Sequence, residues 1–146
     1  MHSSIRSPKR SLGLLEWRYC LLSLFLLPLI DVTLRRSGLA GTRRRLQRFS
    51  RTITSTSDGG EKGDWLAPRI ARAVSIAGRR SLWPTSCLRQ ALLLQVLLAR
   101  QGLDSQLKIG VRNTAEEGFG AHAWVERNGQ VLIGGEHASQ QYVALL

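Results

Sequence analysis

Two residues of this chain, Cys87 and His122, have the side chains and the order required for nucleophilic catalysis by a thiol. Cys87 follows Trp83-Pro84-Thr85-Ser86, where proline disfavours helix before it and the small hydroxyl residues are natural N-caps. A thiol in the first turn of the helix that follows faces the positive end of the macrodipole, which favours the thiolate. A cysteine at a helix start and a histidine on a later strand form the thiolate–imidazole pair of many cysteine hydrolases and acyltransferases.

Each of these residues also has a purely structural interpretation. A lone cysteine in an apolar helix is often inert packing, and a histidine in a sheet is often only a satisfied hydrogen-bonding group. The strand-like segment 118–126 places His122 downstream of Cys87 in the same region of the chain, which favours the catalytic interpretation. His137 is a weaker candidate, because it follows the turn-like run Gly134-Gly135-Glu136.

Two helices are expected to position the cysteine. The segment from Cys87 to Gly102 is apolar around almost its whole circumference, so we expect a buried central helix that ends at a glycine C-cap. Asp64 can cap a preceding amphipathic helix that ends near Gly78 and packs against the central one. Its apolar face consists of Leu66, Ile70, Val74 and Ala77.

An antiparallel sheet is expected to carry the histidine. Apolar and polar residues alternate over 107–112, which predicts a half-buried strand, and 121–127 predicts a second one. Asn128-Gly129 is a strong hairpin signal that leads into a third strand over 130–133. A short final strand is expected within 142–146. Helices followed by an antiparallel sheet predict an α+β fold, in which the central helix packs on the sheet.

The N-terminal third of the chain differs in composition from the rest. Residues 1–50 contain ten Lys or Arg and only two acidic residues, a net charge of +8, whereas the remaining residues carry +3. An uncharged run from Tyr19 to Ile30 resembles the core of a signal peptide, but Asp31 follows at once and no small-residue cleavage site is close. At twelve residues the run is too short to span a bilayer. We expect a packed helix or one that lies along a membrane surface.

These features predict three parts of the chain. Residues 1–50 form a basic, Leu-rich helical segment, the Ser/Thr/Gly-rich residues 51–63 form a linker, and residues 64–146 form the catalytic domain. Cys20 and Cys87 stand in very different settings, which fits two free thiols in a reducing cytoplasm. No spacing typical of metal ligands, nucleotide phosphates or dinucleotides is present, so neither a metal nor a cofactor is expected.

The motifs, taken in order, resemble the transglutaminase-like leader peptidases of lasso-peptide biosynthesis. The resemblance rests on Ser86-Cys87-Leu88 with its Leu-rich helix, on Leu107–Arg112, on Ala121–Glu126 and on the Asn128-Gly129 turn. It covers roughly residues 64–146, and the Leu- and Arg-rich N-terminal segment is also of the family's kind. It implies a papain-like or transglutaminase-like core and removal of the leader from a ribosomally made antibiotic precursor peptide.

The resemblance also implies roles and partners. Cys87 is the expected nucleophile and His122 the expected general base and acid. The expected partners are the precursor peptide, a small leader-recognition protein and an ATP-dependent lasso cyclase, with no nucleic acid. The expected location is the cytoplasm, with contact between residues 1–50 and a membrane surface left open.

The third catalytic residue departs from the family's pattern. The family typically has an aspartate some twelve residues after the histidine, where this chain has Gly134, and Glu136 is the nearest acid. Glu126 shares the strand face of His122 but lies about 13 Å along it, too far for direct contact. Glu136 is therefore the preferred candidate. The family also often has arginine three residues after the cysteine, where this chain has Gln90 and places Arg89 one position earlier.

Two other functions remain open at this point. The same cysteine–histidine pair would serve an acyl transferase of transglutaminase type, since only the acceptor, water or an amine, distinguishes the two reactions. A non-catalytic basic module that binds a membrane or a partner through residues 1–50 is the third reading. Binding to nucleic acid is disfavoured, because aromatic residues are not interleaved with the basic ones and no recognised motif is present.

Overall fold

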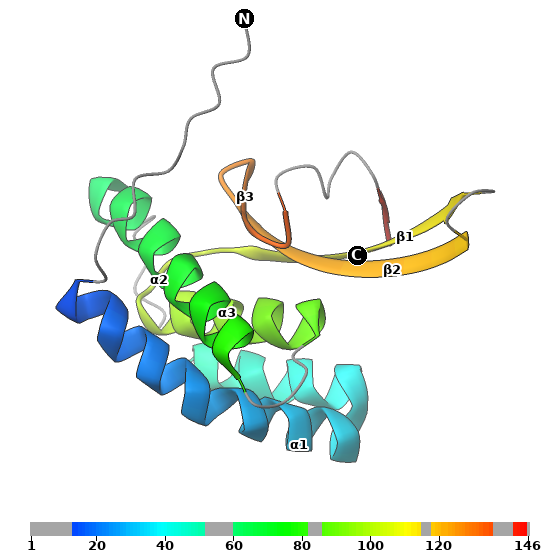
Figure 1. Ribbon diagram of the computed structural model, residues 1–146, viewed down its shortest axis with the longest axis horizontal. Coiled ribbons are helices and arrows are strands. Elements are labelled where there is room, and N and C mark those ends of the chain that lie inside the picture. The colour runs from blue at the N-terminus through cyan, green and yellow to red at the C-terminus, as the bar shows by residue number, and fades with distance from the viewer. Residues whose placement is uncertain (1–12, 52–59, 82–85, 115–117, 136–141, 146) are drawn as a thin grey trace, which may run out of the picture.

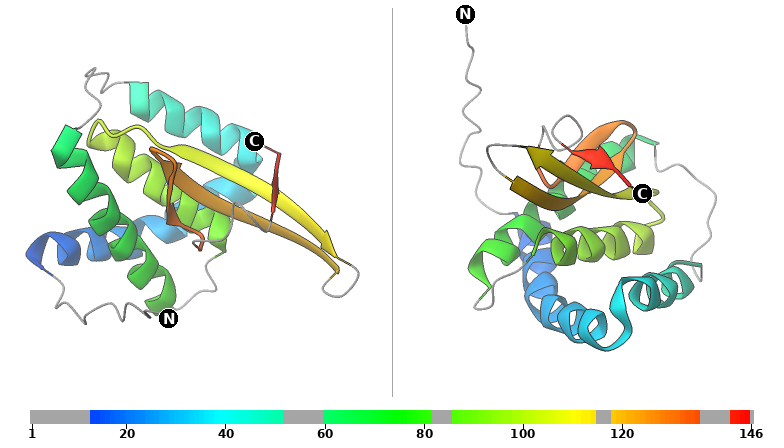
Figure 2. Two further views of the ribbon diagram at one scale, coloured as in Figure 1. Left: turned by 90° about the horizontal axis from the view of Figure 1, so that it is seen from above. Right: turned by 90° about the vertical axis from the view of Figure 1, so that its right-hand side faces the viewer.

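The computed structural model describes residues 13–51, 60–81, 86–114, 118–135 and 142–145. Three helices precede four strands: α1 (Leu14–Arg51), α2 (Gly60–Arg80), α3 (Cys87–Arg100), β1 (Gln106–Thr114), β2 (Gly118–Arg127), β3 (Gln130–Ile133) and β4 (Val143–Ala144). The sheet lies over one side of α3, and α1 lies below the opposite side (Figure 1). Seen from above, the long β1–β2 hairpin runs across the helices (Figure 2). The predicted α+β fold is confirmed.

The central helix is α3, as expected. Four of its leucines, Leu92, Leu93, Leu94 and Leu98, are completely buried, and Leu97 is nearly so. The apolar side chains on all sides of the helix are buried because α1 and α2 pack on one side of it and the sheet packs on the other. The helix ends as predicted: Gly102 adopts a φ of 72°, and the amide of Leu103 donates to the carbonyl of Leu98.

Helix α1 is longer than the apolar run Tyr19–Ile30, from which a helix was predicted. α1 continues to Arg51 across a kink at Gly38, whose φ of 63° and ψ of −178° are not helical. In the part of α1 that precedes the kink, Cys20, Leu27 and Ile30 are buried in the same core as residues of α2 and α3. The N-terminal segment therefore contributes to the core of the domain. The linker proposed for 51–63 lies mostly outside the described residues, and α2 begins within it at Gly60.

The sheet is antiparallel, with strand order β3-β2-β1-β4. Asn128 and Gly129 form the predicted tight turn between β2 and β3, with φ values of 50° and 75°. Gly110 is the register partner of His122, and Lys108 is the partner of Trp124. Because paired residues share a face and neighbours alternate, the even-numbered residues of β1 and β2 lie together on one face.

Candidate active site

Cys87 is the first residue of α3, and its side chain is partly buried against the hydrophobic core. Ser86 is the N-cap in an extended conformation, and its carbonyl accepts hydrogen bonds from the amides of Arg89 and Gln90. The Ser86 side chain makes no capping hydrogen bond. Helix α3 itself has no acidic residue in its first turn.

An ion pair fixes the first turn of α3 to α1. Nη2 of Arg89 lies 2.6 Å from Oδ1 of Asp31, and both side chains are about one-fifth exposed. Asp31 also contacts Arg35, whose Nε lies 3.1 Å from Oδ2. On the other side of the turn, a Cβ on Gly78 of α2 would meet the Gln90 side chain, so the two helices cross closely there. The two residues that depart from the family's pattern thus both hold α3 in place.

The imidazole of His122 lies in an aromatic cluster on β2. Its ring is stacked on Trp124, with centroids 6.4 Å apart, and on Tyr142, with centroids 5.1 Å apart. The guanidinium of Arg112 lies over the Tyr142 ring at 5.1 Å. Gly110, the partner of His122, leaves room for this cluster, since a Cβ there would come within 2.9 Å of Trp124.

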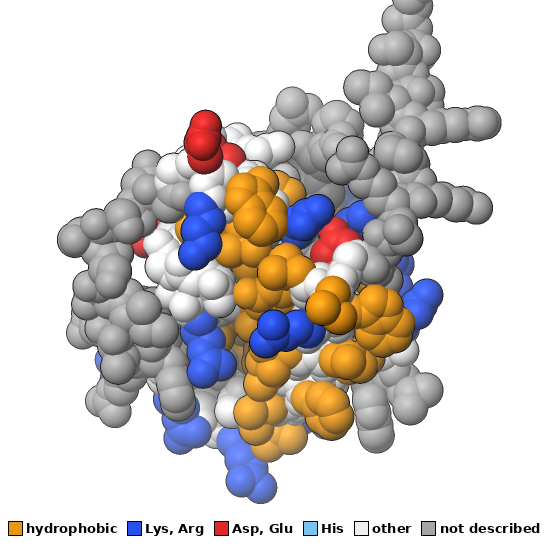
Figure 3. Space-filling view, turned by 90° about the vertical axis from the view of Figure 1, so that its left-hand side faces the viewer, with side chains coloured by type: hydrophobic (Ala, Val, Ile, Leu, Met, Phe, Trp, Pro, Cys, Tyr) orange, Lys and Arg blue, Asp and Glu red, His pale blue; other side chains and the backbone are white. Residues whose placement is uncertain are grey.

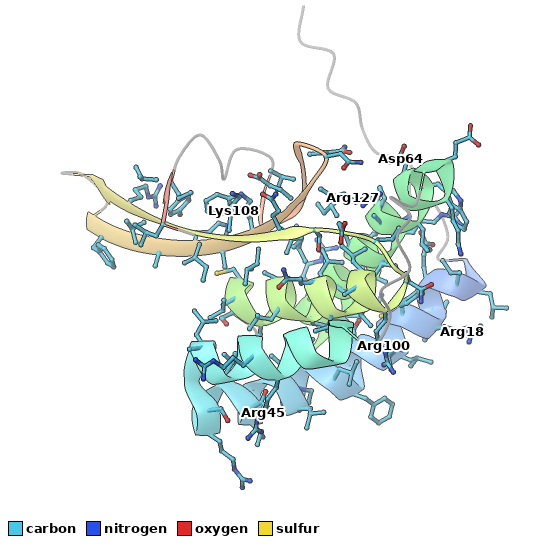
Figure 4. The ribbon with its side chains drawn as sticks, turned by 180° about the vertical axis from the view of Figure 1, so that it is seen from behind. Arg18, Arg45, Asp64, Arg100, Lys108 and Arg127 are labelled. Carbon is cyan, nitrogen blue, oxygen red and sulfur yellow. The ribbon has the colours of Figure 1, made fainter. Side chains whose placement is uncertain are left out.

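This cluster occupies the face of the sheet that points away from α3. The odd-numbered Ala123 and Val125 belong to the core that contains the α3 leucines, and the buried Trp124 does not. Lys108, the partner of Trp124, is seen on the outer side of the sheet in Figure 4. His122 shares that outer face, so the structure does not bring its imidazole into contact with the Cys87 thiol. Among the described residues, no hydrogen bond joins the two.

The main chain supplies the hydrogen-bond partner of His122. Its Nε2 lies 2.5 Å from the carbonyl oxygen of Gly134, twelve residues later in the chain. A carbonyl only accepts, so Nε2 is the donor, and in the neutral form of the ring Nδ1 then keeps the lone pair. Gly134 is the position at which the resemblance leads us to expect an aspartate, and in the structure its backbone oxygen is the partner of the imidazole. Glu136, the predicted third residue, lies outside the described residues, as does His137.

Glu126 has a different partner. Its Oε1 accepts a hydrogen bond of 2.6 Å from the indole Nε1 of Trp124, which in turn stacks on His122. Glu126 therefore orients the tryptophan beside the histidine, and it reaches the imidazole only through that ring. Sequence reasoning missed Tyr142, Arg112 and the Gly134 carbonyl. Gly110, the partner of His122, could have indicated this cluster, because a glycine opposite a candidate base leaves room for other side chains over the ring.

In the part of the chain that the structure describes, no three His, Cys, Asp or Glu residues are grouped as metal ligands. The two cysteines, Cys20 and Cys87, are free thiols. The described fold therefore groups the imidazole with the aromatic and backbone groups that hold it, and it places the thiol separately, at the start of α3.

Comparison with known proteins gives a family. Searches of curated proteins and of solved structures found no match. A model of the transglutaminase-like superfamily matches residues 29–146, which include the second half of α1 and everything after it. That superfamily includes cysteine peptidases and acyl transferases. The match covers most of the chain, and the described helices and antiparallel sheet are consistent with the α+β class of this family. The chain therefore belongs to the transglutaminase-like superfamily.

Proposed function

We propose that this protein is a cysteine peptidase that removes the leader from the precursor of a lasso peptide. The observation that carries the catalytic part is the position of Cys87 as the first residue of the buried helix α3, within a domain of the transglutaminase-like superfamily. His122 on β2 is the proton carrier. The lasso-peptide substrate rests on the resemblance of the motifs around Cys87 and His122.

The reaction uses the two side chains in turn. Nδ1 of His122 takes the thiol proton, and the sulfur of Cys87 attacks the scissile carbonyl carbon. The leaving amine takes the proton from the imidazolium, and a thioester remains on Cys87. Water then gives a proton to Nδ1 as its oxygen attacks the thioester carbon. The C–S bond breaks, the carboxylic acid is released, and the sulfur takes the proton back from the imidazolium, which regenerates the thiol.

The proposal requires a rearrangement of the histidine. The imidazole lies on the outer face of the sheet, whereas the thiol belongs to α3, which packs on the other face. The segment that holds His122 is Gly134-Gly135, whose φ values of 108° and 97° lie in the region that favours glycine. The rearrangement has to release the ring from Gly134 and direct Nδ1 toward Cys87.

A cleavage assay tests the proposal. The purified chain is incubated with the precursor peptide encoded by a neighbouring reading frame, with and without the small leader-recognition protein, and the products are weighed by mass spectrometry. We expect free leader and core peptides, and a higher rate when the recognition protein tethers the substrate. An intact precursor in every mixture would refute the peptidase.

The same assay separates hydrolysis from acyl transfer. With a primary amine present in excess, a transferase yields a product whose new carboxyl terminus carries the amine. A peptidase yields the free acid. Amide product in place of acid would reject the peptidase in favour of a transglutaminase-type reaction while keeping Cys87 as the nucleophile.

A further inference from the structure

One side of α1 exposes a continuous apolar stripe. Its members are three or four residues apart and therefore lie on one face of the helix: Leu14, Trp17, Leu21, Phe25, Leu29 and Val32. Leu14 is 83% exposed and Phe25 80%. From first to last member the stripe is about 27 Å long at the helical rise. Figure 3 shows one face of the molecule on which hydrophobic side chains gather in a band beside Lys and Arg.

The domain core does not account for this stripe. The core takes the opposite face of the helix, where Cys20, Ser23, Leu27 and Ile30 are nearly or fully buried. Helix α1 is thus apolar on two faces, and the described part of the chain buries only one of them. A contiguous exposed patch of this kind is typical of a surface that binds a partner or a membrane.

The charge around the stripe is positive. Arg18, Arg35 and Arg36 are exposed at its two ends. The two acidic residues of the helix are elsewhere: Glu16 is 5% exposed, and Asp31 is engaged by Arg35 and Arg89. An apolar face with a basic border is complementary to an anionic interface.

A hollow of about 550 Å³ adjoins the stripe between α1 and the C-terminal end of α3. Leu21, Leu22 and Leu97 supply apolar walls, and Arg18 and Arg100 supply two guanidinium groups. Figure 4 shows these arginines at the same end of the helix layer. Burial raises the pKa of the nearby Tyr19 hydroxyl, against the opposing effect of Arg18, so that group stays neutral near pH 7. The charge at the hollow is therefore that of the arginines.

We infer that α1 docks this protein onto an anionic phospholipid surface, with its apolar stripe in the acyl region and Arg18 and Arg100 on headgroup phosphates. The hollow combines leucine side chains with two guanidinium groups, and a phospholipid has the complementary chemistry, with apolar chains at one end and an anionic phosphate at the other. Trp17 belongs to the stripe and is half exposed, and an amphipathic indole ring prefers the boundary between lipid and water.

The helix lies along the membrane and does not cross it. Residues Leu14–Thr42 are long and apolar enough for a span by length and composition. Insertion across the bilayer would withdraw Cys20, Leu27 and Ile30 from the core that α2 and α3 complete. It would also bring the Asp31–Arg89 pair into hydrocarbon or break it, at a high cost for a charged group. A flat orientation keeps both faces of α1 in apolar surroundings.

Sedimentation with vesicles tests the inference on the full chain. Vesicles of phosphatidylcholine alone are compared with vesicles in which phosphatidylglycerol replaces a third of the lipid. We expect binding to the anionic vesicles that falls as salt is raised, and little binding to the neutral ones. Arg18→Gln and Arg100→Gln should each weaken the partition coefficient roughly fivefold. Phe25→Ser should weaken it roughly tenfold, because a large apolar side chain is lost.

Matched variants elsewhere control for general effects. Phe119 is 72% exposed on β2, so Phe119→Ser removes a similar side chain away from α1 and should leave binding unchanged. Arg69→Gln on α2 is the corresponding control for charge. Equal binding to neutral and anionic vesicles, or equal losses for Phe25→Ser and Phe119→Ser, would overturn the inference.

Other occupants of the stripe give different results. If a second copy covers it, the chain elutes as a dimer that Phe25→Ser converts to a monomer. If the leader-recognition protein covers it, Phe25→Ser abolishes that complex while vesicle binding is absent in the unmodified chain. Either result would overturn membrane docking.

Discussion

Nε2 of His122 donates a hydrogen bond to the carbonyl oxygen of Gly134 across 2.5 Å. The donor is on β2, and the acceptor directly follows β3, twelve residues later in the chain. A backbone oxygen in this role sets the imidazole tautomer without a side chain, and leaves Nδ1 to accept a proton. The candidate base is therefore oriented by the end of β3 itself, and the geometry of Gly134 governs it.

Gly134→Ala should displace the histidine and destabilise the fold. A Cβ at Gly134 would overlap the Cβ of Trp124 and come within 2.9 Å of its Cα, and the φ of 108° is strained for alanine. We expect a loss of about 2–4 kcal/mol in the free energy of unfolding, measured by denaturant titration. The imidazole resonances of His122 should shift as well.

Gly135→Ala is the control for this effect. Gly135 has a similar φ of 97°, but an added Cβ there meets nothing within 4 Å. We expect only the backbone strain, about 1 kcal/mol. Equal losses for the two variants would show that contact with Trp124 does not matter.

Removal of either catalytic group should abolish cleavage of the precursor. We expect Cys87→Ala and His122→Ala each to lower kcat/KM by a factor of about 10³ or more, because the sulfur forms the bond and the imidazole carries the proton. The double variant should be little worse than either single one, since the two residues act as a unit. Cleavage by Cys87→Ala near the unmodified rate would end the assignment.

The two cysteines should differ in reactivity toward iodoacetamide. Cys20 is 5% exposed, whereas Cys87 is only partly buried and lies at a helix N-terminus. We expect Cys87 to be alkylated first in the folded protein at neutral pH, and both residues to react once denaturant is added. Peptide mapping by mass spectrometry identifies the order. Faster labelling of Cys20 in the folded chain would contradict the structure around α1.

The ion pair between α1 and α3 should contribute more than the exposed one beside it. Arg89→Gln removes a partly buried partner 2.6 Å from Asp31 and should cost about 1–2 kcal/mol of unfolding free energy. Arg35, whose side chain is 73% exposed, contacts the same carboxylate, and Arg35→Gln should cost about 0–0.5 kcal/mol. Thermal or denaturant unfolding of both variants measures the difference. A larger loss of unfolding free energy for Arg35→Gln than for Arg89→Gln would show that the Arg89 ion pair does not hold α3 against α1.

The order of elements could be predicted from local signals. The Pro84 boundary and the Gly102 cap delimited α3, and the Asn128-Gly129 turn delimited the hairpin. These predictions succeeded because caps and tight turns are determined by residues adjacent in sequence. Cys87 at the helix start followed from the same signals.

The sequence by itself determined that His122, Trp124 and Glu126 share one face of a strand, because the side-chain period of a strand is two. It left open which face packs on α3, since β2 buries residues on both sides, Trp124 on one and Val125 on the other. The tertiary structure decided this, by placing the α3 leucines under Val125 and Tyr142 over the histidine. It also decided the partner of His122, because a backbone carbonyl has no signature in the sequence and acquires its role only when β3 folds back.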